Sequence, residues 1–383
     1  MDITSAKSDL WLGRVESALR SCALAGDAQG TVPDTFFDGL DVGLLNRMLL
    51  PLEYGGHPDA QTAMGRASIY SRLGAADPGL TIALPGPGLA LPPVLALATP
   101  EQRANFFGRF QRDRPTWAAF AITEADAGSD ATALTMVAEE RGDHFVLNGS
   151  KYFITNGGRA EVVIVFATVD RKRGRFGIKA FMVDAASEGF SVDRTEDMLG
   201  LRSSQLAVLT MKDCKVPKEC LLGGERRADS FTGAQASWDY MRPLLSSLIV
   251  GTTMRNLETI CGAFEADGTP GRRRARQISC SGLRARVHMA WQLVLKAAWM
   301  FDHAGGSALD SSMAKAAAAS VAAEVSYLAC STMQDVSLEE SASLEMFVRN
   351  AKAFDILEGT GDMQRLMITK LMGGRSRGLI FGS

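Results

Sequence analysis

The hydrophobic periodicity of this chain changes twice, and the change limits the folds open to it. Apolar residues follow helical spacing in residues 1–115, form short β-rich runs in residues 116–228, and return to helical spacing in residues 229–383. Helices and strands need different spacings, so the three zones must form different kinds of unit. The order predicts an α+β protein with an N-terminal α-helical domain, a central β-domain and a C-terminal helical bundle.

The central zone carries the clearest strand signals. Glycine-containing turns separate its β-rich runs, as at Asn148-Gly149, Asn156-Gly157-Gly158 and Lys172-Arg173-Gly174. Closely spaced strands with such turns are typical of a small antiparallel sheet or barrel, which we predict here. The runs begin at His144, Glu161, Ile178 and Leu206.

Residues Leu80–Thr99 carry no charge and are largely apolar, as a membrane-spanning segment would be. The stretch also contains Pro85, Pro87, Pro92 and Pro93, which a lipid-exposed helix could not accommodate. We therefore predict a buried, kinked connector and no membrane partner.

Composition narrows the partners further. The chain has 41 Lys and Arg against 43 Asp and Glu, a formal net charge of -2, which gives no electrostatic case for binding nucleic acid. Four histidines and six scattered cysteines, without a Cys-x-x-Cys pair, predict no metal site. We expect the cysteines to be reduced and the protein to be cytoplasmic, because Met1–Asp9 lacks the apolar core of a secretion signal.

The residues Ile122–Asp130 contain the pattern Thr-Glu-x-x-Ala-Gly-Ser-Asp, and Leu147–Gly157 contain the pattern Asn-Gly-x-Lys-x-x-Ile-Thr-Asn. Both segments resemble motifs of the acyl-CoA dehydrogenase family. Leu357–Thr360 matches its C-terminal Glu-Gly-Thr. The resemblance implies a C-terminal four-helix bundle, an active site between bundle and β-domain, and a homodimer or homotetramer. Weaker matches in the same order, at residues 51–56, 200–204, 238–243 and 313–315, extend it over nearly the whole chain.

The resemblance also implies bound FAD. An isoalloxazine ring needs an apolar wall, hydroxyl donors and close backbone approach, and these segments contain all three. Without the resemblance, threonine-rich strands with glycine turns would fit a plain sheet equally well. The residues expected to bind the cofactor are Phe120, Ile122, Thr123, Gly128, Ser129, Phe153, Thr155, Arg274 and Thr360.

Glu358 is the expected catalytic base. Dehydrogenation next to a thioester carbonyl requires a base for a poorly acidic proton, and a carboxylate in a water-poor pocket has a suitably raised pKa. An isolated Glu would more often be exposed to solvent, so the assignment depends on the family context. Ser129, Asp239 and Arg242 are expected to contact the substrate, although Asp239 and Arg242 also have the spacing of a surface ion pair.

The sequence departs from the family where the ADP half of FAD would bind. Relatives have an Arg-x-x-Phe-Gly segment, usually acting across a subunit interface; residues 267–277 lack Phe-Gly, and we expect arginines such as Arg274 to replace its cation. A glycine-rich loop is missing at Gln334–Glu340, and Asp335 and Asp362 add negative charge, which disfavours a pyrophosphate. Altered ADP contacts, completion by another subunit and loss of flavin are three explanations, of which we favour the first.

The resemblance implies FAD-dependent α,β-dehydrogenation of an acyl thioester, with CoA or an acyl carrier protein as the carrier. The electron acceptor would be an electron-transfer flavoprotein or oxygen. Relatives in small-molecule biosynthesis commonly act on carrier-protein thioesters, and a divergent sequence suits that role. The alternative is a flavin-free thioester-binding or lyase-like protein on the same fold.

Overall fold

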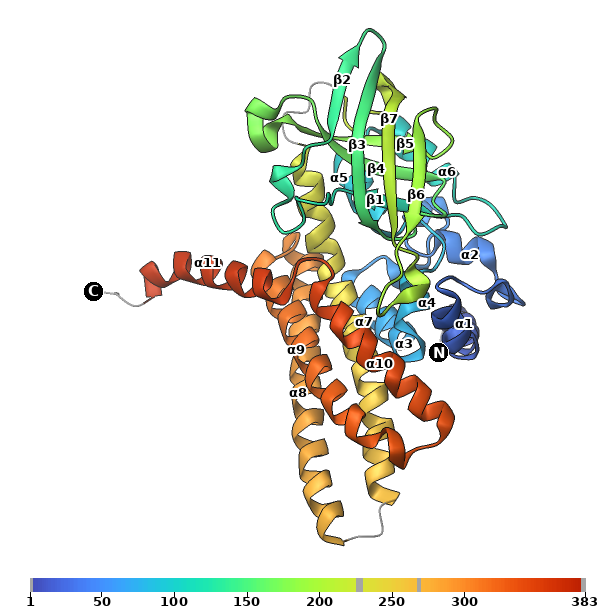
Figure 1. Ribbon diagram of the computed structural model, residues 1–383, viewed down its shortest axis with the longest axis vertical. Helices are drawn as coiled ribbons and strands as arrows, with labels where there is room; N and C mark the ends of the chain where they lie inside the picture. Colours follow the sequence, from blue (N-terminus) through green and yellow to red (C-terminus); the bar gives the residue numbers. More distant parts are fainter. Residues whose placement is uncertain (1–2, 225–229, 267–269, 380–383) are drawn as a thin grey trace.

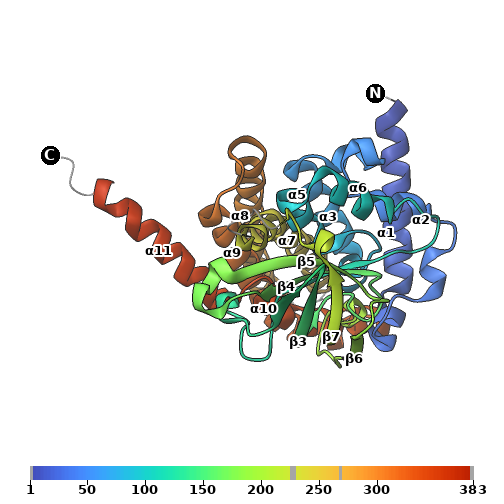
Figure 2. The same cartoon turned by 90° about the horizontal axis from the view of Figure 1, so that it is seen from above.

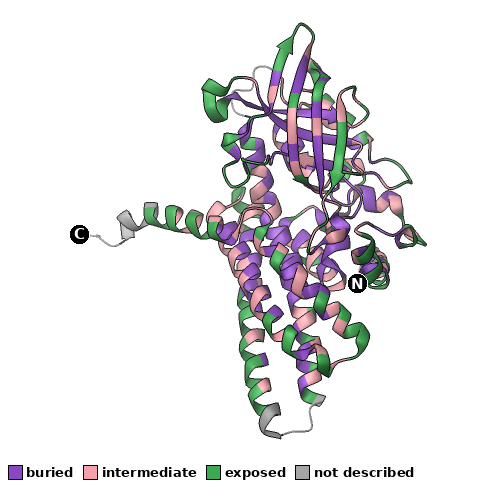
Figure 3. Cartoon of the chain, in the orientation of Figure 1, coloured by how far each residue is buried: buried purple, intermediate pink, exposed green. Residues whose placement is uncertain are grey.

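The computed structural model describes residues 3–224, 230–266 and 270–379. A β-domain forms one end of the molecule, short N-terminal helices lie beside it, and long helices extend from both (Figure 1). Figure 2 shows the N-terminal helices and the bundle meeting the same side of the sheet. Buried residues are found in the sheet, the N-terminal helices and the bundle (Figure 3), and they form three apolar clusters.

The N-terminal unit consists of the long helix α1 and several shorter helices, some of which have well-defined starts. Thr99 and Gln102 form a capping box at α6, and Asp77 caps α4 by accepting from Leu80 N at 2.6 Å. Residues 80–99 form short, buried helices broken at prolines and glycines, which confirms the predicted connector. The helices are α1 (Ile3–Gln29), α2 (Val42–Arg47), α3 (Ala63–Ala76), α4 (Pro78–Ile82), α5 (Leu91–Leu97) and α6 (Pro100–Gly108).

The β-domain is a seven-stranded sheet of order β1-β4-β2-β3-β7-β6, with β5 paired to β4. All seven residues of β4 are buried, which agrees with its unbroken apolar sequence. The expectation of an antiparallel sheet is wrong at two points, because both β1 and β2 pair with β4 in parallel. The strands are β1 (Ala118–Ala121), β2 (Val137–Arg141), β3 (His144–Ile154), β4 (Val162–Thr168), β5 (Ile178–Asp184), β6 (Phe190–Thr195) and β7 (Ala207–Pro217).

The C-terminal unit is a bundle of four helices, and a fifth helix projects from it (Figures 1 and 2). Alanine-rich faces allow close packing, and the apolar cluster of the bundle extends from Ala63 to Phe354. The bundle helices are α7 (Phe231–Ala266), α8 (Pro270–Ala304), α9 (Ala308–Thr332) and α10 (Leu338–Ile356), and the projecting helix is α11 (Gly361–Leu379).

Helix α3 joins the N-terminal unit to α7 by a glycine-mediated crossing. A Cβ at Gly251 would overlap the Ser71 carbonyl, and one at Gly74 would overlap the backbone of Leu248. Thr252 Oγ1 also donates to the Gly74 carbonyl at 2.7 Å. The two backbones therefore touch, which fixes α7 against the N-terminal helices.

The expectation that the cysteines are all reduced is wrong. Cys261 on α7 and Cys280 on α8 form a disulfide between Cα atoms 6.0 Å apart. Both cysteines are buried, and the antiparallel pairing of the two helices brings them together.

Among the described residues, no helix is both long and apolar enough to cross a membrane.

Candidate active site

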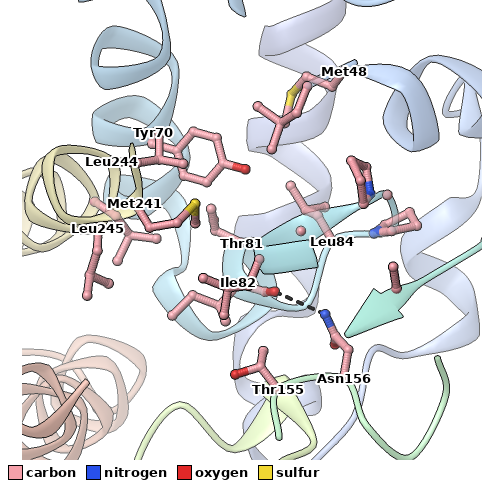
Figure 4. Close-up of a pocket in the computed structure, with 18 of the residues that line it drawn as sticks. Met48, Tyr70, Thr81, Ile82, Leu84, Thr155, Asn156, Met241, Leu244 and Leu245 are labelled. Atoms are coloured by element: carbon pink, nitrogen blue, oxygen red, sulfur yellow. Dashed lines mark hydrogen bonds between the residues drawn. The ribbon is translucent and has the colours of Figure 1, made fainter. Parts of the chain in front are cut away.

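A cavity lies where the N-terminal helices, the β-domain and α7 meet (Figure 4). It contains about 910 Å³ of space that protein atoms do not fill, part of it open to solvent. Asn156 Nδ2 donates to the Ile82 carbonyl at 3.4 Å and joins the end of β3 to α4. This first cavity is mostly apolar, and its lining includes Leu45, Met48, Tyr70, Thr81, Thr155, Met241, Leu244, Leu357 and Glu358.

Glu358 lies in the turn between α10 and α11. Its φ is 55° and that of Gly359 is 92°, so two successive residues are left-handed and the chain reverses sharply. Gln364 Nε2 donates to the carbonyl oxygens of both residues at 3.1 Å. A Cβ at Gly359 would lie 2.8 Å from Gln364 Nε2, so glycine is needed for this closure.

Two cations hold the turn from neighbouring helices. Arg242 on α7 donates from Nε to the Glu358 carbonyl at 3.3 Å, and Lys315 on α9 donates from Nζ to the Asp355 carbonyl at 2.7 Å. Lys315 is fully buried, and this burial lowers its pKa to about 8. Burial raises the pKa of Glu358, and the charges of Arg242 and Lys315 oppose that rise. The result is a carboxylate of raised basicity held on the wall of an apolar cavity.

On the β-domain side, a buried ion pair orders the predicted cofactor segments. Lys151 Nζ donates to Glu124 Oε1 at 2.8 Å and to the Ile122 carbonyl at 3.0 Å. Glu124 also accepts from the backbone N–H groups of Thr135 and Met136. This network holds the chain around Thr123 against β3, because the Tyr152 N–H donates to the Thr123 carbonyl at 2.9 Å.

Phe153 is unusual in two respects. Its φ is 56°, and its side chain is 54% exposed, although phenylalanine favours neither a left-handed backbone nor solvent. Outliers of this kind concentrate at ligand sites, where another molecule compensates for the strain. The next residue but one, Thr155, lines the first cavity.

The structure brings only some of the predicted residues to the first cavity. Thr155 and Glu358 line it, and Arg242 bonds to the turn that carries Glu358. Of the others, Gly128 and Ser129 are exposed, Ile122 is buried, and Phe120, Thr123 and Thr360 are half-buried without lining it.

Arg274 is exposed one turn into α8, and this helix begins at the end of the bundle farthest from the β-domain (Figure 1). It therefore lies far from Glu358 within one chain. The two acids expected to repel a pyrophosphate both have arginine neighbours: Asp335 lies 3.4 Å from Arg276, and Asp362 lies 3.1 Å from Arg365. The side chains of Arg272 and Arg273 lie outside the described residues.

A second cavity adjoins the first across Leu49, which lines both. Asp239 lines it, and a buried oxygen of its carboxylate, Oδ1, has no hydrogen-bond partner among the described residues. Burial raises the pKa of Asp239, against the charge of Arg242. An acceptor of this kind is satisfied when a ligand supplies a donor such as an amide N–H. The other lining residues include Gln61, Pro92, Arg175, Phe231 and Gln235.

Sequence reasoning missed the roles of Lys315 and Asn156. Lys315 lies in the alanine-rich run of α9, and a lone charge in such a run is the signal that could have marked it. Asn156 lies within the recognised hairpin, but its contact with α4 depends on tertiary packing.

Two family models match the chain. The acyl-CoA dehydrogenase middle domain matches residues 119–214, and the acyl-CoA dehydrogenase C-terminal domain matches residues 231–373. The mitochondrial short-chain specific acyl-CoA dehydrogenase of Rattus norvegicus is 32% identical over 284 residues, which are 73% of this chain and 68% of that protein. Its Homo sapiens counterpart is 30% identical over 331 residues, 85% of this chain and 79% of that protein. The chain belongs to the acyl-CoA dehydrogenase family.

Solved structures agree with this assignment. The butyryl-CoA dehydrogenase of Megasphaera elsdenii matches this acyl-CoA dehydrogenase with a TM-score of 0.85 at 26% identity, covering 97% of this chain and 98% of the other. A prolyl acyl carrier protein oxidase shares the fold with a TM-score of 0.85 at 24% identity, covering 96% and 99%. This acyl-CoA dehydrogenase is thus an oxidoreductase of the class that dehydrogenates acyl thioesters.

Proposed function

We propose that this protein carries out FAD-dependent α,β-dehydrogenation of an acyl thioester, with Glu358 as the catalytic base. The observation that carries the proposal is the position of Glu358 on the wall of the first cavity, with a pKa that burial raises. Removal of a weakly acidic proton next to a thioester carbonyl requires a base that is stronger than an ordinary carboxylate. The apolar lining supplies the water-poor surroundings that make Glu358 such a base.

In the proposed reaction, the C–H bond at the α-carbon breaks and its proton moves to the Glu358 carboxylate. The flavin, when bound, supplies the acceptor for the hydride that leaves the β-carbon, so a carbon–carbon double bond forms and the electrons balance. Arg242 and Lys315 keep the Glu358 turn in place through its backbone and that of Asp355. Their positive charges favour the ionised, proton-accepting form of Glu358 before the reaction.

The β-domain residues fit a flavin ring. Exposed Phe153 offers an aromatic face in a strained backbone conformation, and Thr155 offers a hydroxyl on the cavity wall. Gly128 leaves open space beside Thr123, since a Cβ there would have its nearest neighbour at 3.9 Å. Phe153, Thr155 and Thr123 would hold the ring side of the cofactor, with Phe120, Ile122, Ser129 and Thr360 around them.

The ADP side would need a second copy of the chain, because Arg274 lies at the far end of the bundle. We therefore include a homodimer or homotetramer in the proposal. The projecting helix α11 supports it, because Leu366 and Met372 are 63% and 50% exposed there.

The second cavity would hold the pantetheine arm of the substrate, since Asp239 Oδ1 can accept from an amide of that arm. Both CoA and acyl carrier proteins present this arm.

Oxidised electron-transfer flavoprotein or oxygen would then remove the electrons from the reduced flavin. Of the structural neighbours, one at 26% identity is an electron-transferring flavoprotein structure of Acidaminococcus fermentans, and another is the carrier-protein oxidase described above.

The test is the visible spectrum of the purified protein, with and without a saturated acyl thioester under anaerobic conditions. Bound oxidised flavin absorbs near 450 nm, and reduction by substrate bleaches this band. A protein that neither purifies with flavin nor binds added FAD would contradict the proposal and favour the flavin-free thioester-binding alternative. If the protein holds flavin but no acyl thioester bleaches the flavin band, the cofactor assignment would stand and the assignment of acyl thioesters as substrates would be wrong.

A further inference from the structure

The loop between β4 and β5 is strongly basic. Arg171, Lys172, Arg173 and Arg175 lie within five residues, with Asp170 as the only acid among residues 170–177. All four cations are exposed (Figure 3). The loop adjoins the second cavity, because Arg175 lines it together with residues of α7.

The loop holds Lys172 and Arg173 on a well-defined backbone. The Asp170 side chain accepts from the Lys172 N–H at 2.9 Å, and a Cβ at Gly177 would overlap the Asp170 carbonyl. Arg171 is anchored, since its Nη2 donates to the Thr135 carbonyl at 2.7 Å. Lys172 and Arg173 therefore stand on a closed, glycine-dependent loop whose shape comes from backbone contacts.

At the opposite end of the β4–β5 hairpin, basic groups are neutralised within the chain. Arg109 pairs with Asp184 at 2.8 Å, and Arg112 pairs with Glu161 at 2.9 Å. The basic loop itself carries four cations and one acid in its sequence, and it adjoins the second cavity. It also displays Phe176, which is 46% exposed and lies 4.8 Å from the Arg175 guanidinium. An exposed aromatic ring beside arginine is a combination that protein interfaces favour.

We propose that the loop Arg171–Gly177 docks an acidic acyl carrier protein, whose phosphopantetheine arm then enters the second cavity. This inference rests on the proposed function and names the carrier. The charges favour a protein over the phosphates of CoA, because they spread over an exposed surface that includes an apolar ring. Phosphate sites instead converge charge-assisted donors on one ligand group. Complementary charge would speed encounter and orient the arm toward Asp239.

The test compares three substrates that carry the same acyl group on a carrier protein, on CoA and on free pantetheine. The variant is Lys172→Glu with Arg173→Glu. The matched control is Arg14→Glu with Lys212→Glu, which makes the same change of charge at exposed positions outside both cavities. We expect kcat/KM for the carrier-bound substrate to fall roughly tenfold or more in the variant, and to lose its salt dependence. The pantetheine thioester should react as in the wild type, and the control should resemble the wild type with all three.

Equal losses for all three substrates would overturn the inference, since they would show damage to the cavity. A loss for acyl-CoA and none for the carrier-bound substrate would overturn it in favour of a CoA phosphate site. Docking is also measured without catalysis, by fluorescence anisotropy of labelled, phosphopantetheinylated acyl carrier proteins with acidic surfaces. Binding that the variant loses and the control keeps would support the docking surface even if no thioester were dehydrogenated. Absence of binding to wild type would overturn it while leaving the proposed reaction intact.

Discussion

The Arg242 guanidinium on α7 donates a hydrogen bond from Nε to the backbone carbonyl of Glu358, 3.3 Å away. The contact joins residues that are 116 positions apart in the sequence. It uses the main chain of Glu358, so the turn is fixed without recruiting the carboxylate. The Glu358 side chain can therefore be exchanged with little consequence for the fold.

Replacement of Glu358 by glutamine should remove dehydrogenation and preserve the structure. The amide keeps the shape of the side chain but cannot accept the α-proton, and loss of a general base typically slows a reaction by roughly 10²- to 10⁴-fold. Stopped-flow bleaching of the flavin band measures the step directly. Asp362→Asn, at a side chain that is 91% exposed four residues later, is the control and should react normally. Near-normal bleaching in Glu358→Gln would show that Glu358 is not the catalytic base and that another residue accepts the proton.

Replacement of Lys315 by methionine should move the pH profile of kcat/KM. Lys315 is one of two cations that hold down the pKa of Glu358, so its loss lets that pKa rise further. The base must be ionised to act, and the acidic limb of the profile should therefore shift to higher pH. Lys315→Arg keeps the charge and should keep the limb near its original position. An unshifted limb in Lys315→Met would show that the ammonium serves only to hold the Asp355 carbonyl.

Replacement of Phe153 by glycine should weaken flavin binding without weakening the fold. Glycine accepts the left-handed backbone that strains phenylalanine there, and the exposed ring contributes little to the core. We expect the free energy of unfolding of apo-protein to stay within about 1 kcal/mol of wild type, because the relief of strain offsets the added freedom of the unfolded chain. Flavin affinity should fall roughly tenfold, as an aromatic contact is lost. Titration of apo-protein with FAD checks this, with Phe176→Ala as an exposed control.

Asp77 should make the fold less stable as the pH rises. Burial raises its pKa to about 7, while the unfolded chain should titrate near 3.9. The folded state therefore binds the proton more tightly, and the stability it gains below pH ~4 is lost as the pH rises through about 7. Between the two ends of this pH range, the contribution of Asp77 to the free energy of unfolding changes by on the order of 4 kcal/mol. Asp77→Asn keeps the cap at α4 and should flatten this loss in denaturant titrations between about pH 4 and pH 7, the interval between the unfolded and folded pKa values. Asp41→Asn, at the exposed cap of α2, should leave it unchanged.

Local patterns predicted much of this molecule. The helical–β–helical order was predicted from periodicity, because the apolar residues of each zone follow the spacing of one kind of secondary structure. The proline-rich stretch of residues 80–99 was predicted as a buried connector because prolines break helices wherever they lie. The segment around Glu358 was recognised from its motif, and the structure places that residue on a cavity wall.

Features that depend on packing between distant segments could not be predicted. For β1 to pair with β4 in parallel, β2 and β3 must lie on the far side of β4 in the sheet, and no local sequence signal predicts that order. The disulfide joins cysteines 19 positions apart, which meet only because α7 and α8 pack antiparallel. Likewise, Lys315 reaches the Asp355 carbonyl only through the packing of α9 on α10.

The left-handed backbone at Glu358 bears on how such a chain can evolve. An L-residue with a side chain is disfavoured there by roughly 1–2 kcal/mol, whereas glycine is not. A lineage maintained only for folding would drift toward glycine at position 358, and nothing else in the turn would resist the change. The glutamate is thus an amino acid that selection for stability opposes. If Glu358 is the base we propose, its presence is what would distinguish a working enzyme from a descendant that keeps only the architecture.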